Sequence, residues 1–82
     1  MIHLPEIWDI IQANMPRERW VPLQEIYQIV ERYGDLDAED FEPESPTSDR
    51  PKWKRNVRNV LRYRNASTGE IQWDGRARYL LP

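Results

Sequence analysis

The chain has 82 residues, of which 12 are basic and 14 acidic, and a formal net charge of −2 at pH 7. This length allows one small domain with a modest core. Cysteine is absent and histidine occurs once, which excludes disulfides and makes a poor zinc site. No apolar run approaches the roughly 20 residues that cross a bilayer, and no signal-peptide pattern is present. We therefore expect a soluble, cytoplasmic protein with no membrane partner, metal or cofactor.

Two helices are predicted in the first half of the chain. The first spans residues 5–14, because Pro5 suits the first helical position and apolar residues recur at helical spacing. Residues 19–21 should be extended, since they precede a proline. The second helix spans residues 22–33, with Gly34 ending it in a left-handed conformation. The expected buried stripes are Ile7, Ile10, Ile11 and Met15 in the first helix and Leu23, Ile26, Tyr27 and Val30 in the second.

An acidic loop is predicted over residues 35–50. Residues 35–49 contain seven acidic residues and no basic one, and prolines and hydroxyl residues leave little to bury. We expect some mobility here, with room for one helical turn over residues 37–41 and with Phe41 as an apolar anchor.

A third, basic helix is predicted from near Pro51 to near Asn65. Residues 50–64 hold seven of the 12 basic residues and no acidic one. Helical spacing divides this segment into two faces. The apolar face carries Trp53, Val57, Val60 and Leu61, and the opposite face carries Lys52, Arg55, Asn56, Asn59, Arg62 and Tyr63.

A β-hairpin is predicted over residues 70–81, around the turn signal Asp74-Gly75. A two-residue loop would place Ile71 opposite a charged residue. A three-residue loop would put Ile71, Trp73, Ala77 and Tyr79 on one face. We favour the longer loop because the apolar pattern usually decides register.

Three helices followed by a hairpin form the order of a winged helix, so we expect an α+β, three-helix winged helix-turn-helix domain over residues 1–82, with the C-terminal hairpin as the wing. A basic helix in an acidic domain is also the electrostatic footprint of a nucleic-acid reader. In such domains the third helix enters the major groove.

The residues also resemble a known family. The segment WVPLQEIYQIV and the segment from residue 51 to the C-terminus are similar to winged-helix domains attached to bacterial restriction endonucleases, both Mrr-like and HNH-associated. The pattern positions are Trp53, Val57-Arg58, Leu61, Gly69 to Ile71, Gly75 and Tyr79. The resemblance implies a targeting module for double-stranded DNA that reads methylated bases, N6-methyladenine among them, through an aromatic surface such as Trp53 or Trp73.

The expected DNA contacts fall into three groups. Guanidinium and amide groups read base edges, and cations neutralise phosphates. The base readers are Arg55, Asn56 and Asn59, joined by Trp53 through the resemblance. The phosphate contacts are Lys52, Lys54, Arg58, Arg62 and Arg64. Trp73, Arg76 and Arg78 lie on the wing, which either contacts DNA or is an ordinary exposed hairpin.

Other interpretations stay open. Some of the cations would neutralise the acidic loop, which would then fold back on the helix and compete with DNA. Three alternatives to a DNA reader of this kind are a protein-interaction module for an acidic partner, a small transcriptional regulator, and a targeting domain excised from a nuclease. Catalysis is not expected, since no nucleophile–base set or phosphate-binding glycine loop is present.

Overall fold

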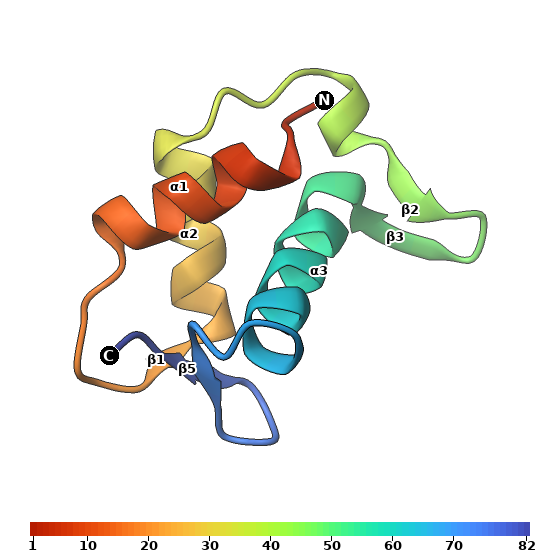
Figure 1. Ribbon diagram of the computed structural model, residues 1–82. Helices are drawn as coiled ribbons and strands as arrows, with labels where there is room; N and C mark the ends of the chain where they lie inside the picture. Colours follow the sequence, from red (N-terminus) through yellow and green to blue (C-terminus); the bar gives the residue numbers. More distant parts are fainter.

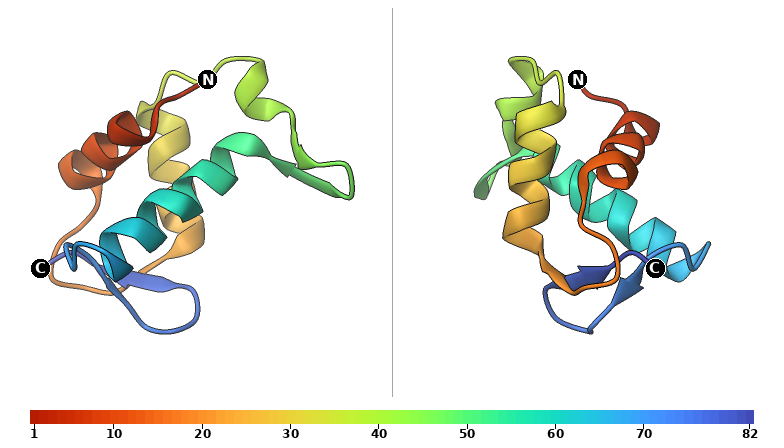
Figure 2. Two further views of the ribbon diagram at one scale, coloured as in Figure 1. Left: turned by 45° about the vertical axis from the view of Figure 1, so that its right-hand side comes forward. Right: turned by 90° about the vertical axis from the view of Figure 1, so that its left-hand side faces the viewer.

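The computed structural model describes all of residues 1–82 and has an α+β fold with three helices and small antiparallel sheets, as predicted at that level. The helices pack together, and two hairpins lie at opposite ends of the third helix (Figures 1 and 2). In chain order the elements are α1 (Leu4–Asn14), β1 (Val21–Pro22), α2 (Leu23–Tyr33), the 3-10 turn η1 (Glu39–Phe41), β2 (Pro43–Ser45), β3 (Ser48–Pro51), α3 (Lys52–Ala66), β4 (Gln72–Trp73) and β5 (Arg78–Leu80).

Each helix begins and ends within one residue of its predicted position. A proline marks every start: Pro5 lies in the first turn of α1, and Pro22 and Pro51 immediately precede α2 and α3. Proline is suited to these positions because its fixed φ matches the helix and its missing N–H would be unpaired there anyway. The helix boundaries therefore follow from local sequence.

One cluster of fifteen buried hydrophobic side chains forms the core. The predicted stripe of α3 is buried in full, and the stripes of α1 and α2 are buried or half-buried. Burial of this apolar surface is the main stabilising term. Val21 of β1 belongs to the same cluster, as do Ile71 and Leu81, which directly flank β4 and β5.

A three-stranded antiparallel sheet closes the C-terminal end of α3, with the strand order β1–β5–β4. Trp73 pairs with Tyr79, so the connection between β4 and β5 is longer than the two- or three-residue loops weighed from the sequence. In this register Ile71 and Leu81 are both buried, whereas Ala77 is exposed. The predicted three-residue loop is therefore wrong.

The side chain of Asp74 accounts for this longer loop. Its Oδ1 accepts the backbone N–H groups of Arg76 at 2.8 Å and Arg78 at 3.1 Å. Gly75 adopts φ = 86°, a left-handed conformation that favours glycine. The carboxylate thus replaces the backbone hydrogen bonds that a tighter turn would have made.

The acidic segment is a hairpin, which the prediction of a plain loop missed. β2 pairs with β3, with Pro43 opposite Pro51 and Ser45 opposite Ser48. Proline is tolerated in such a two-stranded hairpin because each strand is an edge. The packing of both strands against α3 supports a segment that has few apolar residues of its own.

A buried carboxylate, and not Phe41, anchors this segment. Phe41 is exposed, whereas Asp40 is fully buried in η1. The Asp40 carboxylate accepts the N–H of Ile2 at 3.0 Å and that of Asp37 at 3.0 Å. The single helical turn was predicted, but its anchor is polar because a buried carboxylate needs hydrogen-bond donors and finds them here.

Gly34 ends α2 without a left-handed conformation, so that prediction is wrong. Its φ is −85° and its N–H donates to the carbonyl of Val30 at 2.8 Å. A Cβ at this position would lie 2.6 Å from the Val30 carbonyl oxygen and 3.1 Å from Ile2 Cδ1. Glycine is therefore required here by close packing.

Candidate nucleic-acid interface

Two adjoining hollows lie along the side of α3 that faces α2 and the β4–β5 hairpin. The larger one, of about 350 Å³, lies between the C-terminal half of α3, the start of α2 and the hairpin, and we call it the hairpin hollow. The smaller one, of about 190 Å³, lies beside the N-terminal half of α3. Leu23 and Arg58 line both, so the two form one continuous basic groove.

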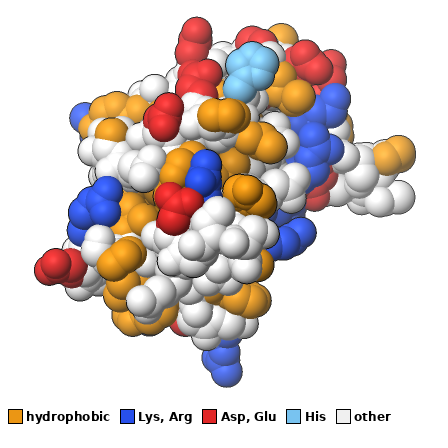
Figure 3. Space-filling model, in the orientation of Figure 1, with side chains coloured by type: hydrophobic (Ala, Val, Ile, Leu, Met, Phe, Trp, Pro, Cys, Tyr) orange, Lys and Arg blue, Asp and Glu red, His pale blue; other side chains and the backbone are white.

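Five cationic side chains and no acidic one line this groove. Like charges gathered in a cleft with a partly apolar wall raise the local concentration of anions. Figure 3 shows Lys and Arg atoms beside α3 and at the tip of the β4–β5 hairpin on the face drawn there. The five cations of the groove are Arg50, Lys54, Arg58, Arg62 and Arg76.

Arg58 occupies the middle of the groove and is held in a fixed position. Its Nη1 donates to the hydroxyl of Tyr27 at 3.1 Å, and its Nη2 donates to the carboxylate of Glu44. The bond to Arg58 lowers the pKa of Glu44 below its ordinary value. A guanidinium with two fixed partners is ordered before any ligand arrives, but part of its charge is neutralised.

Lys54 is ordered by aromatic rings. Its ammonium lies 5.1 Å from the ring centre of Tyr27 and 5.7 Å from that of Trp53. These two rings pack edge to face with centroids 5.8 Å apart. The attraction between a cation and the ring faces places Lys54 at the edge of the groove.

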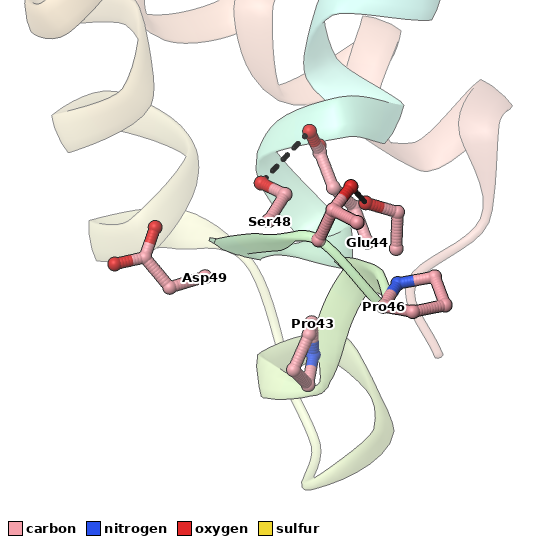
Figure 4. Close-up of a pocket in the computed structure, with 7 residues that line it drawn as sticks. Pro43, Glu44, Pro46, Ser48 and Asp49 are labelled. Carbon is pink, nitrogen blue, oxygen red and sulfur yellow. Dashed lines mark hydrogen bonds between the residues drawn. The ribbon is translucent and has the colours of Figure 1, made fainter.

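The acidic hairpin folds back on α3, as one interpretation of the sequence had it. Lys52 pairs with Glu42 at 2.9 Å, and Arg55 donates to the backbone carbonyl of Glu44 at 3.5 Å. Figure 4 shows the hydrogen bond that Ser48 donates to the Glu44 carboxylate between the two strands, near the turn, at a distance of 3.4 Å. Exposed pairs of this kind contribute about 0–1 kcal/mol, so the attachment is salt-sensitive.

Two predicted base readers are buried, and this corrects their expected role. Trp53 is 2% exposed and Asn56 is 6% exposed. Asn56 follows Trp53 by three residues and precedes Val60 by four, which places it on the core side of α3. Neither side chain reaches a base edge from there.

Besides Asn59, four predicted contacts on α3 and in the β4–β5 hairpin are exposed to solvent, and the three cations among these four make no ion pair. Arg62, Arg76 and Arg78 are exposed and unpaired, and Trp73 is 47% exposed. Arg62, Arg76 and Trp73 meet at the hairpin hollow, whereas Arg78 does not line it. The structure thus brings together residues that the sequence had assigned to separate groups.

A second side of α3, which faces α1, carries a hollow with a mostly apolar lining. Asn59, predicted as a base reader, opens there onto a hollow of about 350 Å³ shared with Leu4, Trp8 and Tyr63. Arg64 lies 5.0 Å from the ring centre of Trp8 and pairs with Glu70 at 2.7 Å. The predicted contacts Asn59 and Arg64 therefore line this hollow and not the basic groove.

Sequence reasoning missed the contribution of α2 to the groove. Leu23 and Tyr27 were assigned to the buried stripe, and their spacing gave no sign that they also border a cleft. Tyr79 was likewise assigned to a buried face; burial raises the pKa of its hydroxyl, which stays protonated. Only the packing of α2 and the hairpin against α3 brings these side chains beside the cations.

No protein-family model, curated protein or solved structure matches this chain. The helices are all too short or too polar to span a membrane. No three His, Asp or Glu side chains converge in an arrangement that would hold a metal ion. The geometry of the basic groove is therefore the basis for assigning a function.

Proposed function

We propose that the chain is a winged-helix DNA-binding domain. The single observation that carries this proposal is the basic groove, in which five cations and no acid lie between α2, α3 and the β4–β5 hairpin. In this interpretation α2 and α3 are the helix-turn-helix pair and the hairpin is the wing. The pairing of β1 with β5 joins the hairpin to the two residues before α2 and supports this assignment of the wing.

The contacts divide by position. Arg62, exposed on α3, is the base reader that best suits the groove. Arg55 lies two turns earlier on the same face of the helix. Lys54, Arg58 and Arg76 neutralise phosphates. The acidic hairpin lies against the N-terminal half of α3, so DNA approaches from the C-terminal half of the helix and the wing.

A finer proposal follows from the resemblance to restriction-associated domains. The target would carry a methylated base, such as N6-methyladenine, and the domain would direct a nuclease to it. Trp73 is the aromatic side chain that suits this role, because it is exposed beside Arg62 and Arg76. The test is a comparison of the affinities for unmodified, N6-methyladenine and 5-methylcytosine duplexes at one salt concentration. Equal affinities would contradict the recognition of methylated bases but not the binding of DNA.

The main experiment measures duplex binding by fluorescence anisotropy between 50 and 200 mM salt. The three phosphate contacts of Lys54, Arg58 and Arg76 predict a slope of about −2.7 in log K against log salt, or an affinity loss of about 40-fold over this range. Arg62→Ala should weaken binding and change sequence preference, whereas Arg32→Ala, an exposed arginine away from the groove, should do neither. No binding at 50 mM salt, or no dependence on salt, would contradict the proposal.

A second candidate is a protein-interaction module for an acidic partner. The observation in its favour is that α3 already accepts carboxylates, from Glu42 and Glu44 of its own chain. Titration with polyglutamate separates the two candidates. Micromolar binding of polyglutamate without binding of random duplex DNA would favour the module.

A further inference from the structure

The hairpin hollow has an apolar wall that a phosphate-binding cleft does not need. Strand alternation places Ile71, Trp73, Tyr79 and Leu81 on one face of the sheet. Ile71 and Leu81 are buried in the core, and the same face continues outward as Trp73 and Tyr79. The exposed indole of Trp73 therefore extends the apolar surface of the core to solvent.

Cations surround this apolar wall. Arg62 and Arg76 have no ion-pair partner and line the hollow from α3 and from the hairpin tip, while Arg58 closes it toward the smaller hollow. Asp74, the nearest carboxylate in the hairpin, is engaged by the backbone N–H groups of Arg76 and Arg78. An anion entering the hollow meets free guanidinium groups on two sides.

A flat, apolar body joined to an anion is the ligand that matches both features. Aromatic side chains bind unstacked bases through their faces, and neighbouring cations hold the phosphate. The volume of about 350 Å³ lies at the lower end for ligand pockets and suits one nucleotide. The phosphates of an intact duplex would use the arginines but leave Trp73 without a partner.

We propose that the hairpin hollow accepts a single unstacked nucleotide of a bound strand, with its base on Trp73 and its phosphate between Arg62 and Arg76. At this site Arg62 binds the phosphate of the unstacked nucleotide in place of the base edge that an intact duplex would present to it. This inference rests on the proposed DNA-binding function and narrows it to strands that offer a bulged, extruded or terminal nucleotide. Double-stranded DNA without such a nucleotide still binds through the rest of the groove, but more weakly.

The experiment compares three labelled probes at one salt concentration: a blunt 16-base-pair duplex, the same duplex with one unpaired thymidine, and a ten-residue oligothymidylate. The bulged duplex should bind about tenfold more tightly than the blunt one, as expected for one base stacked on an aromatic ring. Trp73→Ala should remove this difference, and Trp73→Phe should restore part of it. Far-UV circular dichroism checks that both variants keep the fold.

Two arginines of the same hairpin provide a matched control. Arg76→Ala and Arg78→Ala remove the same charge two residues apart, but only Arg76 lines the hollow. Arg76→Ala should reduce the preference for the bulged duplex, whereas Arg78→Ala should weaken both duplexes by the same factor. Identical behaviour of the two variants would overturn the inference, because the preference for the bulged duplex would then depend on net charge and not on the position of the arginine.

The remaining outcomes separate the inference from the proposed function. Equal binding of bulged and blunt duplexes, or a preference that survives Trp73→Ala, would overturn the nucleotide site and leave duplex binding intact. Binding of oligothymidylate through Trp73 without binding of either duplex would support the site and contradict the duplex reader. Binding of none of the three probes would overturn both.

Discussion

The two hairpins at the ends of α3 are attached to the molecule in different ways. The β2–β3 hairpin is exposed or half-buried along its whole length and is joined to α3 by ion pairs. The β4–β5 hairpin shares a sheet with β1 and is anchored in the core by Ile71. One hairpin is therefore held by charge and the other by buried apolar surface.

This difference determines which charges stay available. Glu42 and Glu44 of the first hairpin engage Lys52 and Arg58, so the N-terminal half of α3 is partly neutralised. At the tip of the second hairpin the only carboxylate is bound by backbone amides, and its arginines remain free. The positive surface therefore depends on where each carboxylate finds its hydrogen-bond partners and not on the number of cations.

The largest expected effect is a loss of stability on replacing Ile71, which anchors the β4–β5 hairpin in the core. Ile71→Ala should lower the free energy of unfolding by about 2–5 kcal/mol, because it leaves a cavity at a side chain that is 1% exposed. Thr47→Ala, at the exposed tip of the first hairpin, should change it by less than about 0.5 kcal/mol. Urea denaturation measures both, and similar values would contradict the proposed difference in attachment.

Asp40 should be the next most sensitive position, since it connects the acidic segment to the N-terminal residues. Asp40→Ala leaves the buried N–H of Ile2 and the partly buried N–H of Asp37 without this acceptor and should cost about 1–3 kcal/mol. Asp40→Asn keeps one acceptor oxygen and should cost less. Urea denaturation measures the free energy of unfolding of these variants, with Asp35→Ala at an exposed position as the control. An unchanged free energy of unfolding in Asp40→Ala would show that other contacts hold the acidic segment.

Removing a carboxylate from the first hairpin should strengthen DNA binding. Glu44→Gln frees the guanidinium of Arg58 and should raise duplex affinity by up to about fivefold, the scale of a partly exposed ion pair. Asp49→Asn removes the same charge from the same hairpin without breaking an ion pair, so it should have a smaller effect. Anisotropy titrations distinguish the two, and equal gains would mean that only net charge matters.

The smallest expected effect is a difference in acid response. The pKa of Glu44 is lowered from about 4.5 by the bond to Arg58, and the pKa of Asp74 is lowered from about 3.8 by backbone N–H groups. Lowered pKa values stabilise the fold above these ordinary values, and the stabilisation is lost as pH falls through each folded-state pKa. Amide NMR shifts between about pH 2 and 5 should show each hairpin loosening as its own carboxylate is protonated. A transition in the β2–β3 hairpin that survives Glu44→Gln would contradict this.

Much of the fold could be read from the residues. The helical spacing of apolar side chains and the prolines at the starts predicted all three helices to within one residue. The buried stripe of α3 was identified in full. These features are local: a helix boundary and the direction of its apolar face depend on neighbours within a few positions in the chain.

The candidate site was less accessible to sequence reasoning. The burial of Trp53 agrees with its place in the apolar stripe of α3, and only the family resemblance suggested that it reads a base. Asn56 was placed on the polar face, and the packing of other segments decides that it is covered. The register of the second hairpin goes with side-chain hydrogen bonds of Asp74 to Arg76 and Arg78, which the turn signal Asp-Gly does not predict. The acidic hairpin has almost no apolar pattern, so its pairing became visible only against α3.

The sequence by itself determined the separation of charge, seven acids followed by seven cations, and the helical division of the basic segment into two faces. Only the tertiary structure decided which cations are free. Arg58 and Lys52 are engaged by a hairpin that precedes them, whereas Arg62 meets Arg76 and Trp73 from a hairpin that follows. Charges act over distances in space, so their pairing depends on how remote segments pack and not on their order in the chain.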